Sequence, residues 1–117
     1  MNMKFFRCPD CGSIVAPFST APCHGEEVTP KTADYATEKH VPVVEVNGSQ
    51  VKVTVGSTPH PMQENHYIEW ICLETEQGFQ VKRLKPGDAP AAVFALASGD
   101  KVVSAYEKCN LHGLWKN

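Results

Sequence analysis

The 117-residue chain lacks the features that mark nucleic-acid-binding and membrane proteins. Lysine and arginine (11) nearly balance aspartate and glutamate (13), and there is no basic run and no long acidic tail. Nucleic acid is therefore not expected as a partner, because proteins that bind it concentrate positive charge. The sequence has no apolar h-region of a signal peptide, and no segment approaches the roughly 18 apolar residues of a membrane span. We expect a soluble cytoplasmic protein that has no membrane partner.

The sequence also lacks sustained helical periodicity, internal repeats and low-complexity stretches. Its pattern is β throughout: apolar residues alternate over Val51–Val55, shortly after Asn47-Gly48, a dipeptide suited to the positive φ of hairpin turns. We predict two more hairpins, around Gln77-Gly78 and around Ser98–Asp100. The predicted strands cover residues 41–44, 51–55, 66–73, 79–84, 93–96 and 102–106. Six or seven short strands separated by turns predict an all-β antiparallel sandwich.

The composition favours one ordinary domain with a small appendage, since 42% of the residues are hydrophobic. Residues 4–7 are predicted to form a short strand, and the polar segment Glu26–Ala36 is predicted to be a connector. We therefore expect a metal-binding module over residues 1–30 and a β-sandwich over residues 31–117. A module that short cannot bury enough apolar surface to fold alone, and a bound metal would supply the missing stabilisation.

Five cysteines and five histidines fall, apart from Cys72, into two candidate ligand sets. The first set occupies the first 24 residues and comprises Cys8, Cys11, Cys23 and His24. The second set is spread over the rest of the chain and comprises His40, His60, His66, Cys109 and His112. A C-x2-C pair in an intracellular chain indicates metal or redox chemistry before a disulfide framework.

The second set has one ligand more than structural zinc takes, since such zinc is almost always four-coordinate. Four imidazoles and one thiolate suggest a redox metal with one open coordination position. Pro59 and Pro61 restrict the backbone on both sides of His60 and favour a rigid presentation of its ring. His40 is predicted to open the first strand of the sandwich, and His66 to stand at a strand start. From spacing alone, two zinc sites, or one zinc site with uninvolved histidines, remain alternatives.

Several segments resemble, in the same order, the signature of the superoxide reductases, the desulfoferrodoxin and neelaredoxin family. They are Ala36–Val43, Gly56-Ser57, His60–Met62, His66–Trp70, Leu84–Pro90 and Cys109–Trp115, and they are spread over nearly the whole range of residues 33 to 116. The resemblance implies an immunoglobulin-like β-sandwich that carries a mononuclear non-haem iron. It also implies the ligands, which are His40, His60, His66 and His112 in the equatorial positions and Cys109 in the axial position.

The activity implied by this resemblance is the one-electron reduction of superoxide to hydrogen peroxide. An external electron donor such as rubredoxin would then re-reduce the iron, and the family also implies a homodimer or homotetramer. Glu38 and Lys39 match a glutamate that can occupy the open position of the oxidised iron and a lysine that assists the oxygen chemistry. The charge of Lys39 beside a ligand also suits it to steer an anion. The alternative for Glu38 and Lys39 is an ordinary solvated charge pair.

The first set departs from the family pattern. Phe5–Gly12 resembles the desulforedoxin-like module of two-iron members, but His24 stands where that module has the second cysteine of an adjacent pair. Three thiolates and one imidazole suit zinc, and they also suit iron, whose potential the imidazole would raise. Zinc, iron and an incomplete site all stay open for residues 1–30.

Two further functions compete with the reductase. A non-catalytic electron carrier would use the same metals only to relay electrons, and a zinc-stapled sandwich would act as an interaction module. Cys72, between Ile71 and Leu73, belongs to neither ligand set and is expected to be a small buried apolar residue.

Overall fold

The structure is a computed structural model, and it describes residues 4–7, 14–15, 26–32 and 37–117. The chain divides into two compact units, Met1–Pro30 and Lys31–Asn117. Within the described residues, no helix has both the length and the apolar character that a membrane span needs.

The first unit contains a small antiparallel sheet in the order β2-β1-β3. Its strands are β1 (Phe5–Arg7), β2 (Ile14–Val15) and β3 (Glu26–Val28). The strand predicted over residues 4–7 is confirmed, whereas β3 lies in the segment predicted to be a connector, so that part of the prediction is wrong. Its three residues, Glu26, Glu27 and Val28, are too few to show a strand pattern. The candidate ligands Cys8, Cys11, Cys23 and His24 lie outside the described residues.

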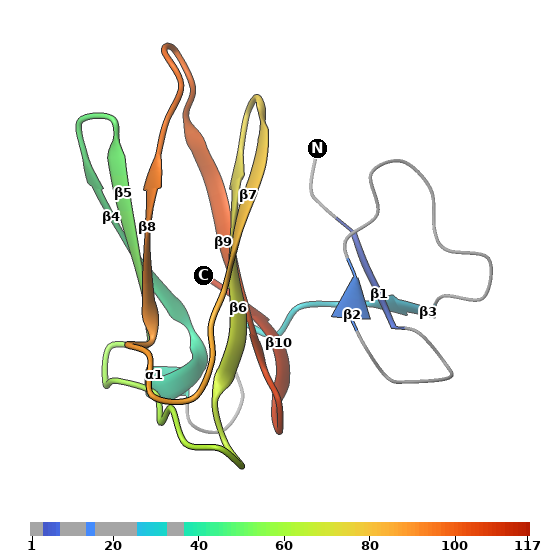
Figure 1. The fold of residues 1–117 in the computed structure, drawn as a ribbon. Helices are drawn as coiled ribbons and strands as arrows, with labels where there is room; N and C mark the ends of the chain where they lie inside the picture. The colour runs from blue at the N-terminus through green and yellow to red at the C-terminus, as the bar shows by residue number, and fades with distance from the viewer. Residues whose placement is uncertain (1–3, 8–13, 16–25, 33–36) are drawn as a thin grey trace. The chain divides into compact units, whose positions relative to one another are not determined.

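The second unit is a sandwich of two antiparallel sheets, in the orders β10-β9-β6-β7 and β4-β5-β8. Figure 1 shows the two sheets as facing layers. The elements are α1 (Thr37–His40), β4 (Pro42–Asn47), β5 (Gln50–Val55), β6 (Ile68–Thr75), β7 (Gly78–Arg83), β8 (Ala91–Ala95), β9 (Val102–Cys109) and β10 (Gly113–Lys116). The predicted all-β antiparallel sandwich is confirmed.

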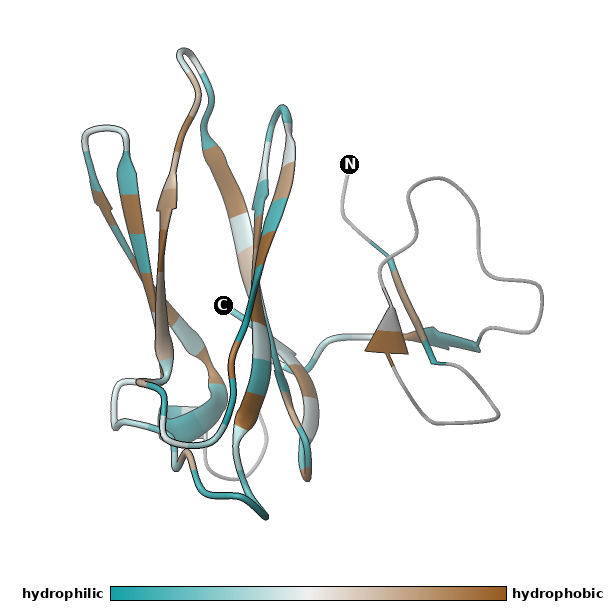
Figure 2. Ribbon diagram, in the orientation of Figure 1, coloured by the Kyte–Doolittle hydropathy of each residue, from teal (hydrophilic) through white to brown (hydrophobic). Residues whose placement is uncertain are grey.

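The core of the sandwich follows from the period-two alternation of its strands. Val51, Val53 and Val55 of β5 are fully buried, and they face Ile71 and Leu73 of β6 within one hydrophobic cluster. Figure 2 shows the resulting alternation of apolar and hydrophilic bands along strands of both sheets. Each such aliphatic side chain contributes about 1.5–3 kcal/mol when it is buried. This core fixes the strand ends and hence the loops that leave them.

Two of the three predicted hairpins are confirmed. β4 and β5 pair around Gly48, whose φ is 63°, and β6 and β7 pair through Thr75 and Gly78. The third hairpin is wrong: β8 pairs with β5 and β9 pairs with β6, so the turn at Gly99 joins two different sheets. A turn signal reveals that the chain reverses, but it does not reveal which strand the next segment joins.

The positions predicted for two histidines also need correction. His40 ends the one-turn helix α1 and does not open a strand, because β4 begins only at Pro42. A proline disfavours helical backbone in the residue before it, which explains why the helix stops there. His66 precedes β6, which begins at Ile68, and forms an isolated bridge with Gln63.

Candidate metal centre

The five residues of the second predicted set meet at one end of the sandwich. His40 ends α1, His60 and His66 lie in the loop between β5 and β6, Cys109 ends β9, and His112 lies in the turn before β10. Their potential ligand atoms all lie within 4.8 Å of one another. Loops from both sheets therefore bring together residues that are up to 72 positions apart.

The four imidazoles form a closed cycle. Neighbouring ring centroids are 4.9 Å apart for His40–His60, 4.7 Å for His60–His66, 5.1 Å for His66–His112 and 4.9 Å for His112–His40. Every neighbouring pair is steeply inclined, by 65–78°. The Sγ atom of Cys109 joins this cycle 3.7 Å from Nδ1 of His112. This is the arrangement expected of four nitrogen donors and one sulfur donor around a common point.

The hydrogen bonds indicate which nitrogen each ring offers. Nδ1 of His60 lies 2.7 Å from the carbonyl oxygen of Pro61 and donates to it, which leaves Nε2 as the lone-pair nitrogen. Metal-binding histidines commonly fix their second nitrogen in this way. Nε2 of His40 lies 3.2 Å from Nδ1 of His112. His112 therefore presents Nδ1 to the cluster, whereas His60 and His40 present Nε2.

The buried nitrogens provide a test of whether a metal fits. Among the described residues, Nε2 of His60 and Nε2 of His66 are buried and have no hydrogen-bond partner. Such an unpaired buried group costs about 1–3 kcal/mol. A cation bound between these nitrogens would satisfy them, so the residues fit a metal ion.

Burial also favours the neutral, metal-binding form of two of the imidazoles, those of His60 and His66. The pKa of His60 is lowered from 6.5 to about 4, mainly by desolvation and also by the charges of the neighbouring histidines, although the hydrogen bond to Pro61 opposes this. Desolvation is also the main cause that lowers the pKa of His66, followed by the positive charges of His112 and Lys39. A metal would therefore compete with few protons at neutral pH.

Cys109 needs a cation to become a thiolate. It is fully buried, and desolvation raises the pKa of its thiol, although hydrogen bonds from the backbone of Leu111 and His112 lower it. Glu107, two residues earlier on β9, is also fully buried, and desolvation raises the pKa of its carboxyl well above the usual range. The charge of Glu107 raises the pKa of the Cys109 thiol further, and the positive charge of Lys108 opposes it. A bound metal ion would hold Cys109 as the thiolate.

Trp115 contacts two of the four clustered histidines, His40 and His112. Its ring stacks on His40, with centroids 4.7 Å apart and planes inclined by 13°. Its Nε1 atom donates to the carbonyl oxygen of His112 at 3.0 Å. One fully buried side chain on β10 thus orients a residue of α1 and a residue of the turn before β10.

Asn110 ties the remaining loops together. Its Oδ1 atom accepts from the backbone nitrogen of Tyr67 at 2.9 Å, and its Nδ2 atom donates to the carbonyl oxygen of Asn65 at 3.1 Å. Its own backbone nitrogen donates to the carbonyl oxygen of Tyr67 at 3.1 Å. The turn that carries Cys109 and His112 is therefore fastened to the segment around His66.

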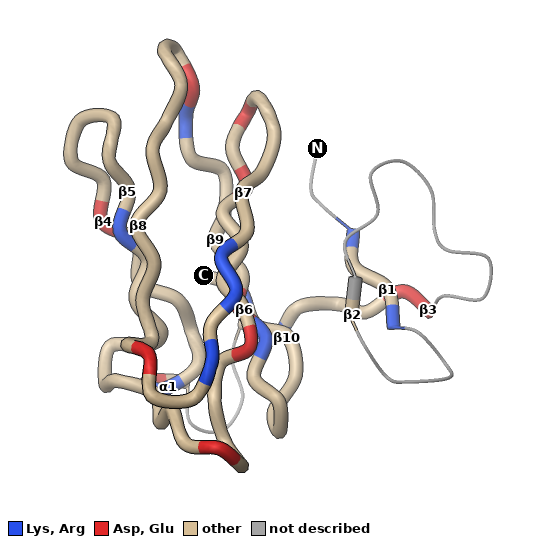
Figure 3. The backbone as a smooth tube through the Cα atoms, in the orientation of Figure 1, with Lys and Arg blue, Asp and Glu red and all other residues tan. Residues whose placement is uncertain are grey.

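Glu38 and Lys39 precede His40 on α1, and both are exposed. Figure 3 shows charged segments of both signs beside α1, among the loops at this end of the sandwich. The effect of Lys39 on the pKa of His66 places its positive charge within electrostatic range of the cluster.

Cys72 is 1% exposed and lies outside the cluster, as predicted, and burial raises the pKa of its thiol to about 12.

No sequence pattern assigns a role to Asn110, Trp115 or Gly56. All three lie in segments that resemble the family, but no local pattern distinguishes a residue that holds a ligand loop from one that only packs. Their contacts emerge only once the loops are assembled.

The Desulfoferrodoxin family model matches residues 32–117. The chain belongs to the desulfoferrodoxin family. A relative, the desulfoferrodoxin of Nitratidesulfovibrio vulgaris, is 48% identical over 97% of this chain and 94% of its own length. The superoxide reductase of Thermococcus kodakarensis is 38% identical over 76% of this chain and 92% of its own.

Solved structures of the family match the fold as well. The crystal structure of the superoxide reductase from Treponema pallidum has a TM-score of 0.82 and 44% identity, and the match covers 100% of this chain and 99% of that one. The superoxide reductase from Giardia intestinalis matches with a TM-score of 0.59 and 35% identity, over 68% of this chain and 95% of that one. The resemblance found in the sequence is therefore confirmed for the family and for the fold.

Proposed function

We propose that this chain is a superoxide reductase that reduces superoxide to hydrogen peroxide at a single iron. The iron would be held by His40, His60, His66, His112 and Cys109. The observation that carries the proposal is the closed cycle of imidazoles joined by one thiol, with all potential ligand atoms within 4.8 Å of one another. The reductase names and shared fold of the relatives support the same reaction.

Bound iron would supply the single electron, and two protons complete the conversion of superoxide to hydrogen peroxide. The side chains prepare the site for an anion. Neutral imidazoles and one thiolate around a ferrous ion leave a net positive charge, to which Lys39 adds its own. Burial of His60 and Cys109 at 3% and 0% exposure keeps water from the ligand side of the site. Each turnover consumes one electron, so we propose an external donor such as rubredoxin.

We further propose roles for Glu38 and Lys39 at the open face of the site. Both precede a clustered histidine and are exposed, which leaves their side chains accessible to an incoming anion and to solvent protons. Lys39 would attract and bind superoxide, while Glu38 would occupy the vacated position after peroxide leaves. The electrostatic influence of Lys39 on His66 supports its placement near the reacting atoms.

For residues 1–30 we propose a second metal module that uses Cys8, Cys11, Cys23 and His24. The three-cysteine, one-histidine composition suits zinc or iron. A cytoplasmic location and a homodimer or homotetramer complete the proposal for the whole chain. Metal analysis of the intact protein and of a Cys8→Ser/Cys11→Ser variant would assign each metal to its site.

The decisive test mixes superoxide with the reduced, iron-loaded protein and follows hydrogen peroxide and oxygen together. We expect one hydrogen peroxide for each iron oxidised, and no oxygen beyond that from uncatalysed dismutation. Evolution of oxygen in proportion to the superoxide consumed would instead identify a dismutase. Failure of superoxide to oxidise the iron would overturn the proposal, and the metal-free protein serves as the control.

A further inference from the structure

The loop after β5 presses directly against the backbone of α1. A Cβ atom at Gly56 would lie 2.7 Å from the carbonyl carbon and 2.9 Å from the Cα atom of Lys39, and still nearer the carbonyl oxygen of Glu38. These are backbone atoms, which cannot swing aside as the end of a flexible side chain would. Gly56 is not among the glycines with positive φ, so this position needs glycine for space and not for its conformational freedom.

The two residues after Gly56 hold the same piece of backbone by hydrogen bonds. The carbonyl oxygen of Glu38 accepts from the backbone nitrogen of Thr58 at 2.9 Å and from Oγ of Ser57 at 3.3 Å. The backbone nitrogen of His60 donates to the carbonyl oxygen of Val55 at 3.0 Å, which closes the loop on itself. One short segment therefore connects α1 to the loop that carries His60.

Helix α1 depends on such contacts, because it has only four residues and one turn of helix is unstable by itself. Its last residue, His40, is fixed by the stacked ring of Trp115. Its middle residues, Glu38 and Lys39, have exposed side chains, so only their backbone is anchored in this way. The position of Lys39 thus depends on the contact with Gly56–Thr58.

We propose that Gly56, Ser57 and Thr58 form a positioning element that sets where Lys39 stands relative to the metal centre. The close approach at Gly56 fixes the distance between the loop and α1, and the two hydrogen bonds to Glu38 fix the direction of the backbone that bears Lys39. The rate at which superoxide reacts therefore depends on residues that do not touch it. This inference rests on the proposed superoxide reductase function.

The test compares Gly56→Ala and Ser57→Ala with Lys39→Ala and with the two double variants that combine each with Lys39→Ala. The second-order rate constant for superoxide is measured in iron-loaded protein at several ionic strengths, and iron content is measured in each sample. We expect Gly56→Ala to keep its iron, to react about tenfold more slowly and to show weaker ionic-strength dependence, because Lys39 is displaced. Ser57→Ala, which loses only an exposed hydrogen bond, is expected to react about two- to threefold more slowly.

The double variants separate positioning from general damage. If Gly56 and Ser57 act through Lys39, each double variant reacts no more slowly than Lys39→Ala alone, since coupled residues are not additive. Additive losses, or wild-type rates in both single variants, overturn the inference. If Gly56→Ala does not fold, the pair Ser57→Ala and Ser57→Ala/Lys39→Ala decides by the same criterion.

A second measurement is independent of activity. In metal-free protein, amide hydrogen exchange at Thr58 and Val41 reports the bond to Glu38 and the turn of α1. Gly56→Ala is expected to speed exchange at both amides. Gly48→Ala, which strains the positive φ of the turn between β4 and β5 but meets no atom within 4 Å, is expected to leave both unchanged. Unchanged exchange in Gly56→Ala overturns the inference. A wild type that does not reduce superoxide defeats the proposed function instead, while this measurement still stands.

Discussion

The two ends of the sandwich are built from the same strands but differ in what their loops contain. One end, here called the hairpin end, consists of the turns at residues 48–49, 76–77 and 96–101. The opposite end, the ligand end, consists of residues 37–41, 56–67, 84–90 and 110–112, together with Cys109. Figure 1 shows the three turns gathered at one end and α1 with the longer loops at the other. The core positions the loops at both ends, but only at the ligand end do polar side chains, those of the five clustered residues, meet at one point.

The difference is also energetic. At the hairpin end, Gly48 and Gly99 supply positive φ, and a Cβ at either would meet no atom within 4 Å. At the ligand end, buried nitrogens of His60 and His66 lack hydrogen-bond partners among the described residues. The ligand end therefore carries a cost that a bound metal offsets, whereas the turns of the hairpin end, all among the described residues, contain no buried polar side-chain atom without a partner. Substitutions at the two ends should differ accordingly: those at the hairpin end change stability alone, and those at the ligand end change chemistry.

The largest effect is expected from Cys109→Ser. Removing the sulfur donor should abolish superoxide reduction and bleach the absorption band that arises from thiolate-to-ferric charge transfer at this centre, because no other thiol of the described residues belongs to the cluster. Visible spectroscopy of the oxidised protein and the superoxide assay measure the two losses. Cys72→Ala is the matched control: it removes a buried thiol outside the cluster and should leave the band intact. Both variants are made in the Cys8→Ser/Cys11→Ser background, and retention of the band in Cys109→Ser there would show that Cys109 is not a ligand.

Asn110→Ala should weaken the link between two ligand loops without removing any clustered residue. It loses the bonds to Tyr67 and Asn65, and residues that support metal ligands typically change metal affinity by about 10–100-fold. Competition with a chelator measures the iron affinity. Gln80→Ala is the control, because its amide also donates to a backbone carbonyl, that of Ala95, but far from the cluster. Equal iron affinities in the two variants would contradict a support role for Asn110.

Much of the ligand end could be predicted from the sequence, because histidine and cysteine are rare and chemically distinctive. All five residues of the second set do come together, although they lie on separate loops. The two hairpins within single sheets were predictable too, since each places a turn signal between apolar runs that pair with one another. The crossing from β8 to β9 was not, because strand partners depend on contacts far apart in the chain.

The supporting residues of the ligand end could not be predicted. Nothing in the pattern around Gly56 shows that its missing side chain makes room for α1, and α1 itself is too short to display helical periodicity. The stacking of Trp115 on His40 likewise requires β10 to pair with β9 in the observed register. Sequence chemistry therefore indicated the ligand set, while the geometry that holds it came from tertiary packing.

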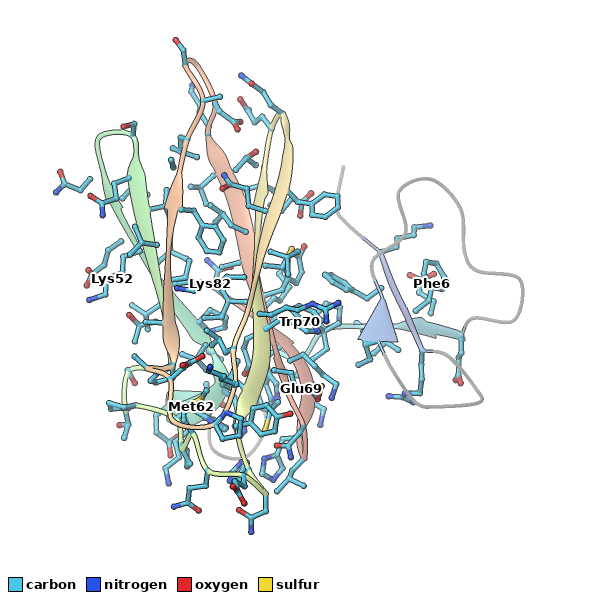
Figure 4. The ribbon with its side chains drawn as sticks, in the orientation of Figure 1. Phe6, Lys52, Met62, Glu69, Trp70 and Lys82 are labelled. Carbon is cyan, nitrogen blue, oxygen red and sulfur yellow. The ribbon has the colours of Figure 1, made fainter. Side chains whose placement is uncertain are left out.

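Lys39→Ala removes one positive charge from the ligand end and so tests whether the location of a charge matters for the reaction with superoxide. We expect the second-order rate constant for superoxide to fall about tenfold and to depend less on ionic strength, since a cation beside the site raises the encounter rate with an anion. Iron content should not change. Lys52→Ala provides the control, because Lys52 carries the same charge on β5 and Figure 4 shows it on the outer side of its sheet, away from Met62 and the ligand end. Equal rate constants in the two variants would show that net charge alone matters.

The smallest effect is expected from pH, and it should be confined to the ligand end. The pKa of His60 in the folded protein, about 4, is lower than its ordinary value of 6.5, so the unfolded chain binds more protons between these values. The free energy of unfolding of the metal-free protein should therefore be constant above pH 6.5 and fall as the pH drops toward 4, by at most about 1.4 kcal/mol per pH unit for each such histidine. Urea unfolding across this range measures the slope, and His60→Gln should make it shallower. A metal-free protein whose stability does not change between pH 6.5 and 4 would show that the imidazoles tolerate protonation, and the energetic contrast between the two ends would then disappear.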